Sequence, residues 1–292
     1  MSSLGHLVEV RCNICNSNEK EIISRADKGN IVRCKRCGLF YKTPRLPDKN
    51  EINKYKSRIY NNSFYNIENR AKKNIYISVL KKIENYKGKM LDIGCSNGYF
   101  LTLARQRGWK PYGVEISDLF LKKAKDNLGE DCVFGIPLRE VKFPSNFFDV
   151  ITMWDVLDHL MDPFEELMEI RRILRKEGLL VIRVRNMSFH ILINRLFRKN
   201  LLGIVKKPAV FHLYGFNNQN IRILLNKAHF TKILIKNSKL TVGDPYSQIN
   251  LLGNYTANFV KGIYWAFSEF IGFLSLQNIN ISPSLIVYAE KT

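Results

Sequence analysis

The sequence predicts an α/β protein with a doubly wound, mostly parallel seven-stranded sheet, an antiparallel last strand and a small N-terminal zinc ribbon. The first observation is that apolar runs of strand length alternate with amphipathic segments of helix length after residue 70, as in β-α-β units. The second is a pair of Cys-x-x-Cys motifs near the N-terminus, typical of a metal site. A chain of 292 residues can hold one large core and this appendage.

The N-terminal cysteines fit a four-thiolate zinc site. Cys12 and Cys15 are separated from Cys34 and Cys37 by 18 residues, which is within the spacing of such sites. Four thiolates complete a tetrahedron and leave no open position, so the Zn²⁺ would be structural. Disulfides or free thiols are the alternative. The first ten residues lack the pattern of a signal peptide, which favours a cytoplasmic protein and therefore the metal.

A glycine-rich turn after the first strand of the large domain is the candidate ligand site. The run Lys89–Ile93 contains Asp92 and is followed by Gly94, Ser96 and Gly98. Ligands of doubly wound sheets lie outside the carboxyl ends of the strands, and glycine lets the backbone approach them closely. The spacing is not that of the dinucleotide fingerprint. A carboxylate at Asp92 disfavours a pyrophosphate and suits a ligand with ammonium and sulfonium groups.

The next strand supplies a second acidic residue. The segment 111–116 ends at Glu115, which follows Asp92 by 23 residues. At this position a carboxylate can accept hydrogen bonds from both hydroxyls of a ribose. The sequence therefore predicts a ligand with a free 2′,3′-diol.

Helix caps and apolar runs predict the other elements. Ser117 is a predicted N-cap, and Asp162-Pro163 a predicted helix start with acidic residues in its first turn. We expect helices at 70–86, 99–107, 118–128, 163–177 and 217–228, and further strands at 132–135, 148–154, 179–185, 231–235 and 284–288.

Three motifs in this order resemble the class I S-adenosylmethionine-dependent methyltransferases. Residues 91–98 are similar to the first motif of that family, Glu115 to its ribose-binding acid, and residues 148–163 to the fourth-strand segment of its small-molecule branch. The resemblance covers about residues 75–240 and implies S-adenosylmethionine as the cofactor. It also implies a set of cofactor-binding residues, namely Asp92, Gly94, Cys95, Ser96, Gly98, Glu115, Ile116, Trp154 and Asp155.

The resemblance also suggests how the chain is divided. The expected parts are the zinc ribbon (1–45), a linker that covers the cofactor mouth (46–70), and a Rossmann-like methyltransferase domain (71–292) with a lid insertion (187–216) and a C-terminal helical insertion (239–281). Residues 37–45 resemble the ribbons that precede methyltransferases of sugar and surface-polysaccharide pathways. By analogy, the acceptor is an oxygen or nitrogen of a small molecule, a sugar or nucleotide-sugar.

Four residues are candidates for catalysis, because a hydroxyl acceptor needs a base. Asp155 and His159 follow the fourth strand, and His212 and Tyr214 come from the lid side. His159 has an alternative role in orienting its loop, and His212 in capping the lid. A divalent ion held by Asp155, Asp158 and His159 is disfavoured, because residues of a single turn leave its shell incomplete.

The distribution of charge leaves a second function open. The formal charge is +20, with 20 Lys/Arg against 8 Asp/Glu in residues 1–90, 14 against 15 in 91–186, and 12 against 3 in 187–292. Basic flanks suit nucleic acid, anionic lipid or a phosphate-bearing substrate, or are simply a solvated surface. The alternative is therefore an RNA methyltransferase whose ribbon and flanks bind phosphates. A third interpretation is a binding module that retains the cofactor without turnover.

One apolar segment near the C-terminus bears on membrane contact. Residues 258–276 are interrupted by Lys261 and Glu269, so we expect no transmembrane segment. A core or lid helix is favoured over attachment to a membrane surface, which the basic flank leaves open.

Overall fold

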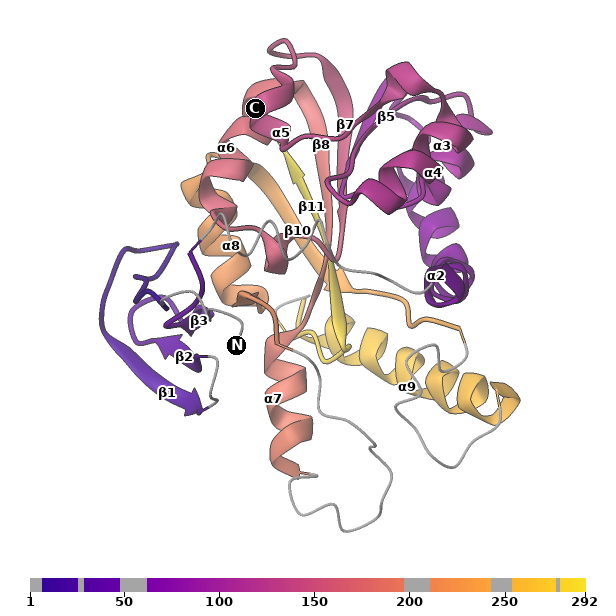
Figure 1. Cartoon of the computed structure of the whole chain (residues 1–292). Helices are drawn as coiled ribbons and strands as arrows, with labels where there is room; N and C mark the ends of the chain where they lie inside the picture. Colours follow the sequence, from indigo (N-terminus) through magenta and orange to yellow (C-terminus); the bar gives the residue numbers. More distant parts are fainter. Residues whose placement is uncertain (1–6, 26–28, 48–61, 197–210, 243–253, 277–278) are drawn as a thin grey trace.

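A computed structural model describes residues 7–25, 29–47, 62–196, 211–242, 254–276 and 279–292 of the chain. These residues form two sheets (Figure 1). The larger has seven strands and is covered by helices, and the smaller has four strands and contains the N-terminal part of the chain. The predicted cover at 46–70 lies largely outside the described residues, as does the middle of the predicted lid.

The large sheet confirms the predicted fold class. Its strand order is β10-β11-β8-β7-β4-β5-β6, and β11 pairs antiparallel with both of its neighbours while the other pairs are parallel. The order reverses at β4, which lies between β7 and β5, so a ligand crevice is expected at its carboxyl end. The strands are β4 (Lys89–Ile93), β5 (Lys110–Val114), β6 (Val133–Phe134), β7 (Phe148–Trp154), β8 (Leu174–Arg185), β10 (Thr231–Asn237) and β11 (Ser284–Glu290).

Helices lie on both faces of this sheet. Figure 1 shows α2, α3 and α4 on one face and α6 and α8 on the other. Asp162 caps α6 by accepting a hydrogen bond from the Glu165 amide, and a capping box at Asn217 starts α8. The helices are α2 (Asn62–Lys82), α3 (Tyr99–Arg105), α4 (Asp118–Leu128), α5 (Leu138–Val141), α6 (Pro163–Ile173), α7 (Met187–Leu196), α8 (Asn218–Lys227) and α9 (Asn254–Leu274), with 3₁₀ turns η1 (Glu130–Cys132) and η2 (Leu157–His159).

Several predicted elements have different limits in the structure. Helix α2 spans Asn62–Lys82 instead of 70–86, so it begins within the predicted linker. The helix expected to run to Gly178 ends at Ile173, and β8 begins at Leu174 rather than at Leu179. Leu174 pairs with Phe148 of β7, so the backbone at this point forms the hydrogen bonds of a sheet instead of those of a helix. The third predicted strand is reduced to two residues, because Cys132 belongs to the 3₁₀ turn η1.

The N-terminal ribbon shares a sheet with the predicted lid. Strands β1 (Lys20–Ser24), β2 (Asn30–Cys34) and β3 (Phe40–Thr43) are antiparallel, and β9 (Tyr214–Gly215) pairs with β3 as the fourth strand. Buried ribbon side chains also belong to the same hydrophobic cluster as the large sheet. The ribbon is therefore continuous with the large domain in both its hydrogen bonding and its core.

The C-terminal apolar segment forms α9, and its apolar face is exposed rather than buried in a core. Phe259 and Phe273 have exposed fractions of 71% and 73%. Among the described helices, none has the length and apolar character required to cross a membrane.

Candidate active site

The turn between β4 and α3 has the left-handed backbone that its glycines permit. The φ angles are +70° at Gly94 and +75° at Gly98, and Ser96 between them has +53°. A Cβ at Gly98 would come within 2.7 Å of Leu128 Cδ1. The amides of Gly94 and Cys95 both donate to the Val114 carbonyl, at 2.8 and 3.1 Å. These bonds hold the turn against the end of β5.

Glu115 links the two loops that follow β4 and β5. Its Oε2 accepts from the Ser96 amide at 2.9 Å, and its Oε1 accepts from the Ser117 amide at 2.8 Å. Burial raises the pKa of the Glu115 carboxyl, and these backbone donors oppose that shift. Glu115 is therefore fixed at the carboxyl end of β5, where the sequence predicts the ribose-binding acid.

Asp92 is a buried carboxylate at the reversal of strand order. Its exposed fraction is 2%, and its Oδ1 accepts a 2.6 Å hydrogen bond from the Thr152 hydroxyl. Burial raises its pKa to about 8, against the lowering effect of the Thr152 hydrogen bond, and the charge of Glu115 adds to the rise. Among the described residues, neither Asp92 nor Glu115 forms a salt bridge. Two buried carboxylates without a paired cation suit a positively charged ligand.

The remaining predicted cofactor residues surround this turn in different ways. The Cys95 side chain is buried beneath the turn, and a Cβ on Gly113 would lie 2.6 Å from the Cys95 sulfur. Cys95 could therefore contact a ligand through its backbone but not through its side chain. Ile116 is partly exposed next to Glu115. Trp154 packs against Tyr76 and Phe100, with both ring centroids at 4.8 Å from its own.

Asp155 stands beyond the end of β7 with a left-handed backbone, at φ +59°. Its Oδ2 contacts two buried cations, Lys72 Nζ at 2.7 Å and the Arg183 guanidinium. Burial alone would raise its pKa, but Arg183 and Lys72 outweigh burial and hold the pKa of Asp155 well below its usual range. Asp155 is therefore ionised at neutral pH, and its charge is already neutralised.

Asp158 and His159 meet His212 from the predicted lid. Arg185 Nη2 lies 2.7 Å from Asp158 Oδ2, and His159 Nε2 lies 3.8 Å from Asp158 Oδ1. Burial raises the pKa of Asp158 to about 6, and it lowers that of His159 to about 3, so the imidazole of His159 is neutral at pH 7. The rings of His159 and His212 have centroids 3.6 Å apart. The structure thus brings together two of the predicted catalytic residues.

The cluster of Asp158, His159 and His212 also has the composition of a metal site, because one ligand atom from each lies within 4.8 Å of the others. Asp155 is not part of it, since its Oδ2 is engaged by Lys72 and Arg183.

Tyr214 lies between the ribbon and the large domain. Its hydroxyl donates to the Met161 carbonyl at 3.0 Å and accepts from Arg45 Nη1 at 3.1 Å. Arg45 also donates to Met161 O at 3.1 Å, from Nη2. These contacts favour a structural role for Tyr214 over the catalytic role that was predicted.

The cations that contact the predicted carboxylates were not among the predicted site residues. Lys72 comes from α2, and Arg183 and Arg185 come from β8. The signal was present in β8, because two arginines two residues apart share one face of a strand that is otherwise apolar from Leu179. Arg183 also donates to the hydroxyls of Ser238 and Ser284, both at 3.1 Å.

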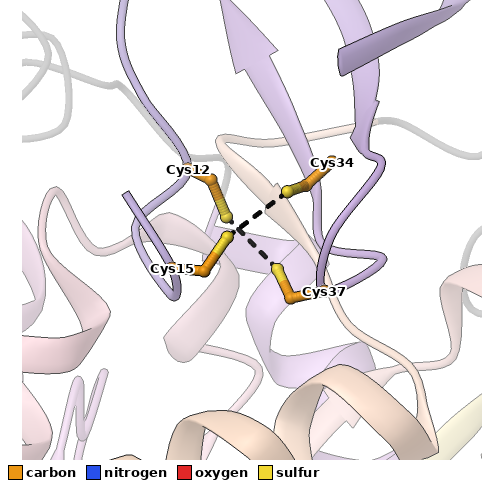
Figure 2. A group of neighbouring side chains, drawn as sticks. All are labelled: Cys12, Cys15, Cys34 and Cys37. Carbon is orange, nitrogen blue, oxygen red and sulfur yellow. Dashed lines mark hydrogen bonds between the residues drawn. The ribbon is translucent and has the colours of Figure 1, made fainter. Parts of the chain in front are cut away.

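The four predicted zinc ligands form one cluster (Figure 2). The Sγ atoms of Cys12 and Cys37 are 3.3 Å apart, those of Cys15 and Cys34 are 3.5 Å apart, and all four lie within 4.8 Å of one another. Zn–S bonds of about 2.3 Å in a tetrahedron place sulfurs about 3.8 Å apart. The cluster is compatible with Zn²⁺.

Comparison with known proteins gives a family match over more than half of the chain. A family model described as a methyltransferase domain matches residues 66–234. Two curated relatives are an uncharacterized methyltransferase of Schizosaccharomyces pombe, 26% identical over 167 residues, and a tRNA U34 carboxymethyltransferase of Photobacterium profundum, 30% identical over 111 residues. These alignments cover 51% and 36% of this chain, and the chain spans only 58% and 34% of the two relatives.

Solved structures share the fold at low identity. A SAM-dependent methyltransferase of Thermotoga maritima aligns with a TM-score of 0.51 over 84% of this chain and 98% of its own, at 18% identity. One from Archaeoglobus fulgidus aligns with a TM-score of 0.52 over 79% of this chain and 100% of its own, also at 18% identity.

Proposed function

The chain belongs to the methyltransferase-domain family, and we propose that it transfers a methyl group from S-adenosylmethionine to an oxygen or nitrogen of a small anionic metabolite, a nucleotide-sugar or sugar acid. The observation that carries this proposal is the arrangement of buried charge at the carboxyl edge of the sheet. Among the described residues, the carboxylates at β4 and β5 form no salt bridge, whereas those after β7 form salt bridges with Lys72, Arg183 and Arg185.

The β4 and β5 side supports the cofactor assignment. When bound, S-adenosylmethionine supplies an electrophilic methyl group for an in-line displacement. The Asp92 carboxylate would face its cationic amino acid portion, and ionisation of Asp92 would be favoured by that charge. Glu115 would accept the ribose hydroxyls from the position fixed by the Ser96 and Ser117 amides.

The β7 and β8 side supports an anionic acceptor. Lys72 and Arg183 contact the carboxylate of Asp155, and Arg185 contacts that of Asp158. Three cations thus gather at this side of the crevice, two of them buried. Such a group of cations favours a phosphate or carboxylate on the acceptor.

His159 and His212 are proposed to receive the proton of a hydroxyl acceptor. His159 is neutral at pH 7 because burial lowers its pKa, so it has a lone pair available. Asp158, 3.8 Å from its ring nitrogen, would stabilise the imidazolium that forms. The salt bridge between Asp158 and Arg185 would reduce this stabilisation of the imidazolium, because Arg185 already neutralises part of the charge of Asp158.

We assign the cysteine cluster to a structural Zn²⁺ that holds the ribbon against the acceptor side. The first knuckle contacts the large domain directly, because Asn13 donates to Asp162 at 2.9 Å and Lys227 donates to the Ile14 carbonyl at 2.7 Å. Strand β3 pairs with β9, next to His212. We expect about one Zn²⁺ per chain by elemental analysis. Cys37→Ser should lower the zinc content and methyl transfer while changing S-adenosylmethionine affinity less than about threefold.

The control is Cys132→Ser, because Cys132 lies outside the cluster. Unchanged methyl transfer after loss of zinc would contradict the proposed link between the ribbon and the acceptor side.

RNA methylation is a second candidate function. It is favoured by the basic flanks and by the similarity over 111 residues to the tRNA U34 carboxymethyltransferase of Photobacterium profundum. Phosphate-driven binding weakens steeply with salt, so affinity for bulk RNA at ~150 mM salt separates the two candidates.

A methyl-transfer screen with labelled cofactor tests the proposal. The acceptors are a panel of nucleoside diphosphate sugars, neutral sugars and total RNA. We expect label in the nucleoside diphosphate sugars, and none with Asp92→Ala or Glu115→Ala. Transfer to RNA alone would favour the second candidate, and transfer only to neutral sugars would contradict the anionic acceptor.

A further inference from the structure

Helix α9 has its apolar side chains on the outside. Apolar side chains spaced three or four residues apart lie along one face of the helix. Their exposed fractions are 59% at Ile263, 53% at Phe267 and 57% at Phe270. Phe259 and Phe273 extend the same stripe towards the two ends of the helix, and Val260 and Leu274 flank it. This is the periodicity of a surface helix, with its apolar stripe turned away from the protein.

Polar and small residues hold the opposite face of α9 on the domain. Ser268 is fully buried, and its carbonyl accepts from Asn237 Nδ2 at 2.8 Å. Lys261 Nζ donates to the Thr241 carbonyl at 3.1 Å, and the Tyr264 hydroxyl donates to the Ile281 carbonyl. The orientation of the helix is therefore fixed by hydrogen bonds, and the exposed stripe is a property of the folded domain.

The positive charge of the chain favours one occupant of this stripe over another. Residues 187–292 contain 12 Lys/Arg and 3 Asp/Glu, and exposed Lys239 lies 5.8 Å above the ring of Trp265 in α9. A second copy docked on α9 would bring together two chains of formal charge +20, which costs free energy. An anionic lipid surface attracts such a chain and also accepts the aromatic side chains of the stripe.

We propose that α9 docks on the surface of an anionic lipid bilayer, with its Phe-rich stripe at the boundary between headgroups and acyl chains. The helix lies along the surface, because its polar face stays bonded to the domain. Its anchor Asn237 is at the carboxyl end of β10, and the adjacent Ser238 accepts from Arg183, the partner of Asp155. Docking thus places the membrane at the edge of the sheet that contains the candidate active site. Figure 1 shows α7 and α9 together beyond that edge.

Cosedimentation of the full chain with vesicles tests this proposal. The probes are vesicles of phosphatidylcholine alone and vesicles with 30% phosphatidylglycerol. We expect the wild-type chain to sediment with the anionic vesicles. The triple variant Ile263→Gln, Phe267→Gln, Phe270→Gln should lower the partition coefficient about tenfold or more. The matched control is Val8→Gln with Ile22→Gln, which removes exposed apolar side chains from the ribbon.

S-adenosylmethionine affinity reports whether the variants are folded, and it should be equal in all three proteins. The proposal is overturned if the wild-type chain does not sediment with anionic vesicles, if it sediments equally with phosphatidylcholine alone, or if the triple variant sediments as the wild type does. Light scattering that shows a wild-type dimer and a monomeric triple variant, without vesicle binding, would assign the stripe to a second copy of the chain.

Discussion

The two halves of the candidate active site hold carboxylates in opposite electrostatic settings. At β4 and β5, Asp92 and Glu115 are bonded to a hydroxyl and to backbone amides, and the pKa of each is raised. At β7, Asp155 is held by Lys72 and Arg183, and its pKa is lowered. Carboxylates at one edge of one sheet are therefore suited to bind a cation on one side and are neutralised by Lys72 and Arg183 on the other.

Strand order places these two electrostatic settings on opposite sides of the crevice. The reversal of order at β4 places β5 on one side of the crevice and β7 and β8 on the other. Arg183 and Arg185 of β8 contact carboxylates on the second side. Under the proposed function, the sulfonium cofactor and the anionic acceptor would therefore be attracted to neighbouring but distinct positions.

The largest expected effect comes from removing the acid at β5. Glu115→Ala should weaken S-adenosylmethionine binding by about two orders of magnitude, because it removes acceptors for both ribose hydroxyls and leaves the amides of Ser96 and Ser117 without their partner. Isothermal titration calorimetry measures this directly. The control is exposed Glu140→Ala. A loss below about threefold would mean that Glu115 only stiffens the loops.

A smaller effect is expected on the acceptor side. Lys72→Met should lower kcat/KM for the acceptor found in the methyl-transfer screen by about tenfold, because it removes one of the cations beside Asp155. The lost positive charge should leave cofactor affinity equal or slightly higher, since Lys72 also acts on Asp92. Steady-state kinetics and calorimetry separate these outcomes. If cofactor affinity fell as much as kcat/KM, the two halves would not be distinct.

The smallest effect concerns stability. The pKa of Asp92 is raised in the folded state, so its contribution to stability is present below the unfolded pKa and is lost as pH rises towards about 8. Asp92→Asn keeps an acceptor for the Thr152 hydroxyl and cannot ionise. Its Tm without cofactor should exceed that of the wild type by a few degrees at pH 8, and the gap should narrow towards pH 5.

Circular dichroism melts across this pH range measure the gap, with exposed Asp118→Asn as the control. A lower Tm for Asp92→Asn at pH 8 would indicate that the native carboxylate has a cationic partner.

Local signals in the sequence predicted much of the fold and of the cofactor side. The helix expected at 118–128 is confirmed as α4, and the strand expected at 148–154 as β7. Ser117 occupies the N-cap position of α4 but its side chain makes no capping hydrogen bond, so the glycine after α4 and the long apolar run of β7 are the signals that define these elements. The glycine turn and its two acids are close in sequence to the strands that position them. Pairings between distant segments were harder to predict.

The features that the sequence did not predict depend on which distant segments become neighbours in the fold. Lys72 and Arg183 are 111 positions apart in the sequence, yet both contact Asp155. The pairing of β3 with β9 involves only two residues of β9, too few for a periodic signal. The outward apolar face of α9 follows from hydrogen bonds to Asn237 and Ile281, which apolarity alone does not reveal.

The most direct test of the central claim is the number of protons released when S-adenosylmethionine binds at pH 7. Calorimetry in buffers of different ionisation enthalpy gives this number. A cation bound beside Asp92 should convert it from a largely protonated to an ionised carboxyl, so the wild type should release most of one proton. Asp92→Asn should release almost none. Binding without proton release, or equal release by both proteins, would contradict the assignment of Asp92 to the cationic cofactor.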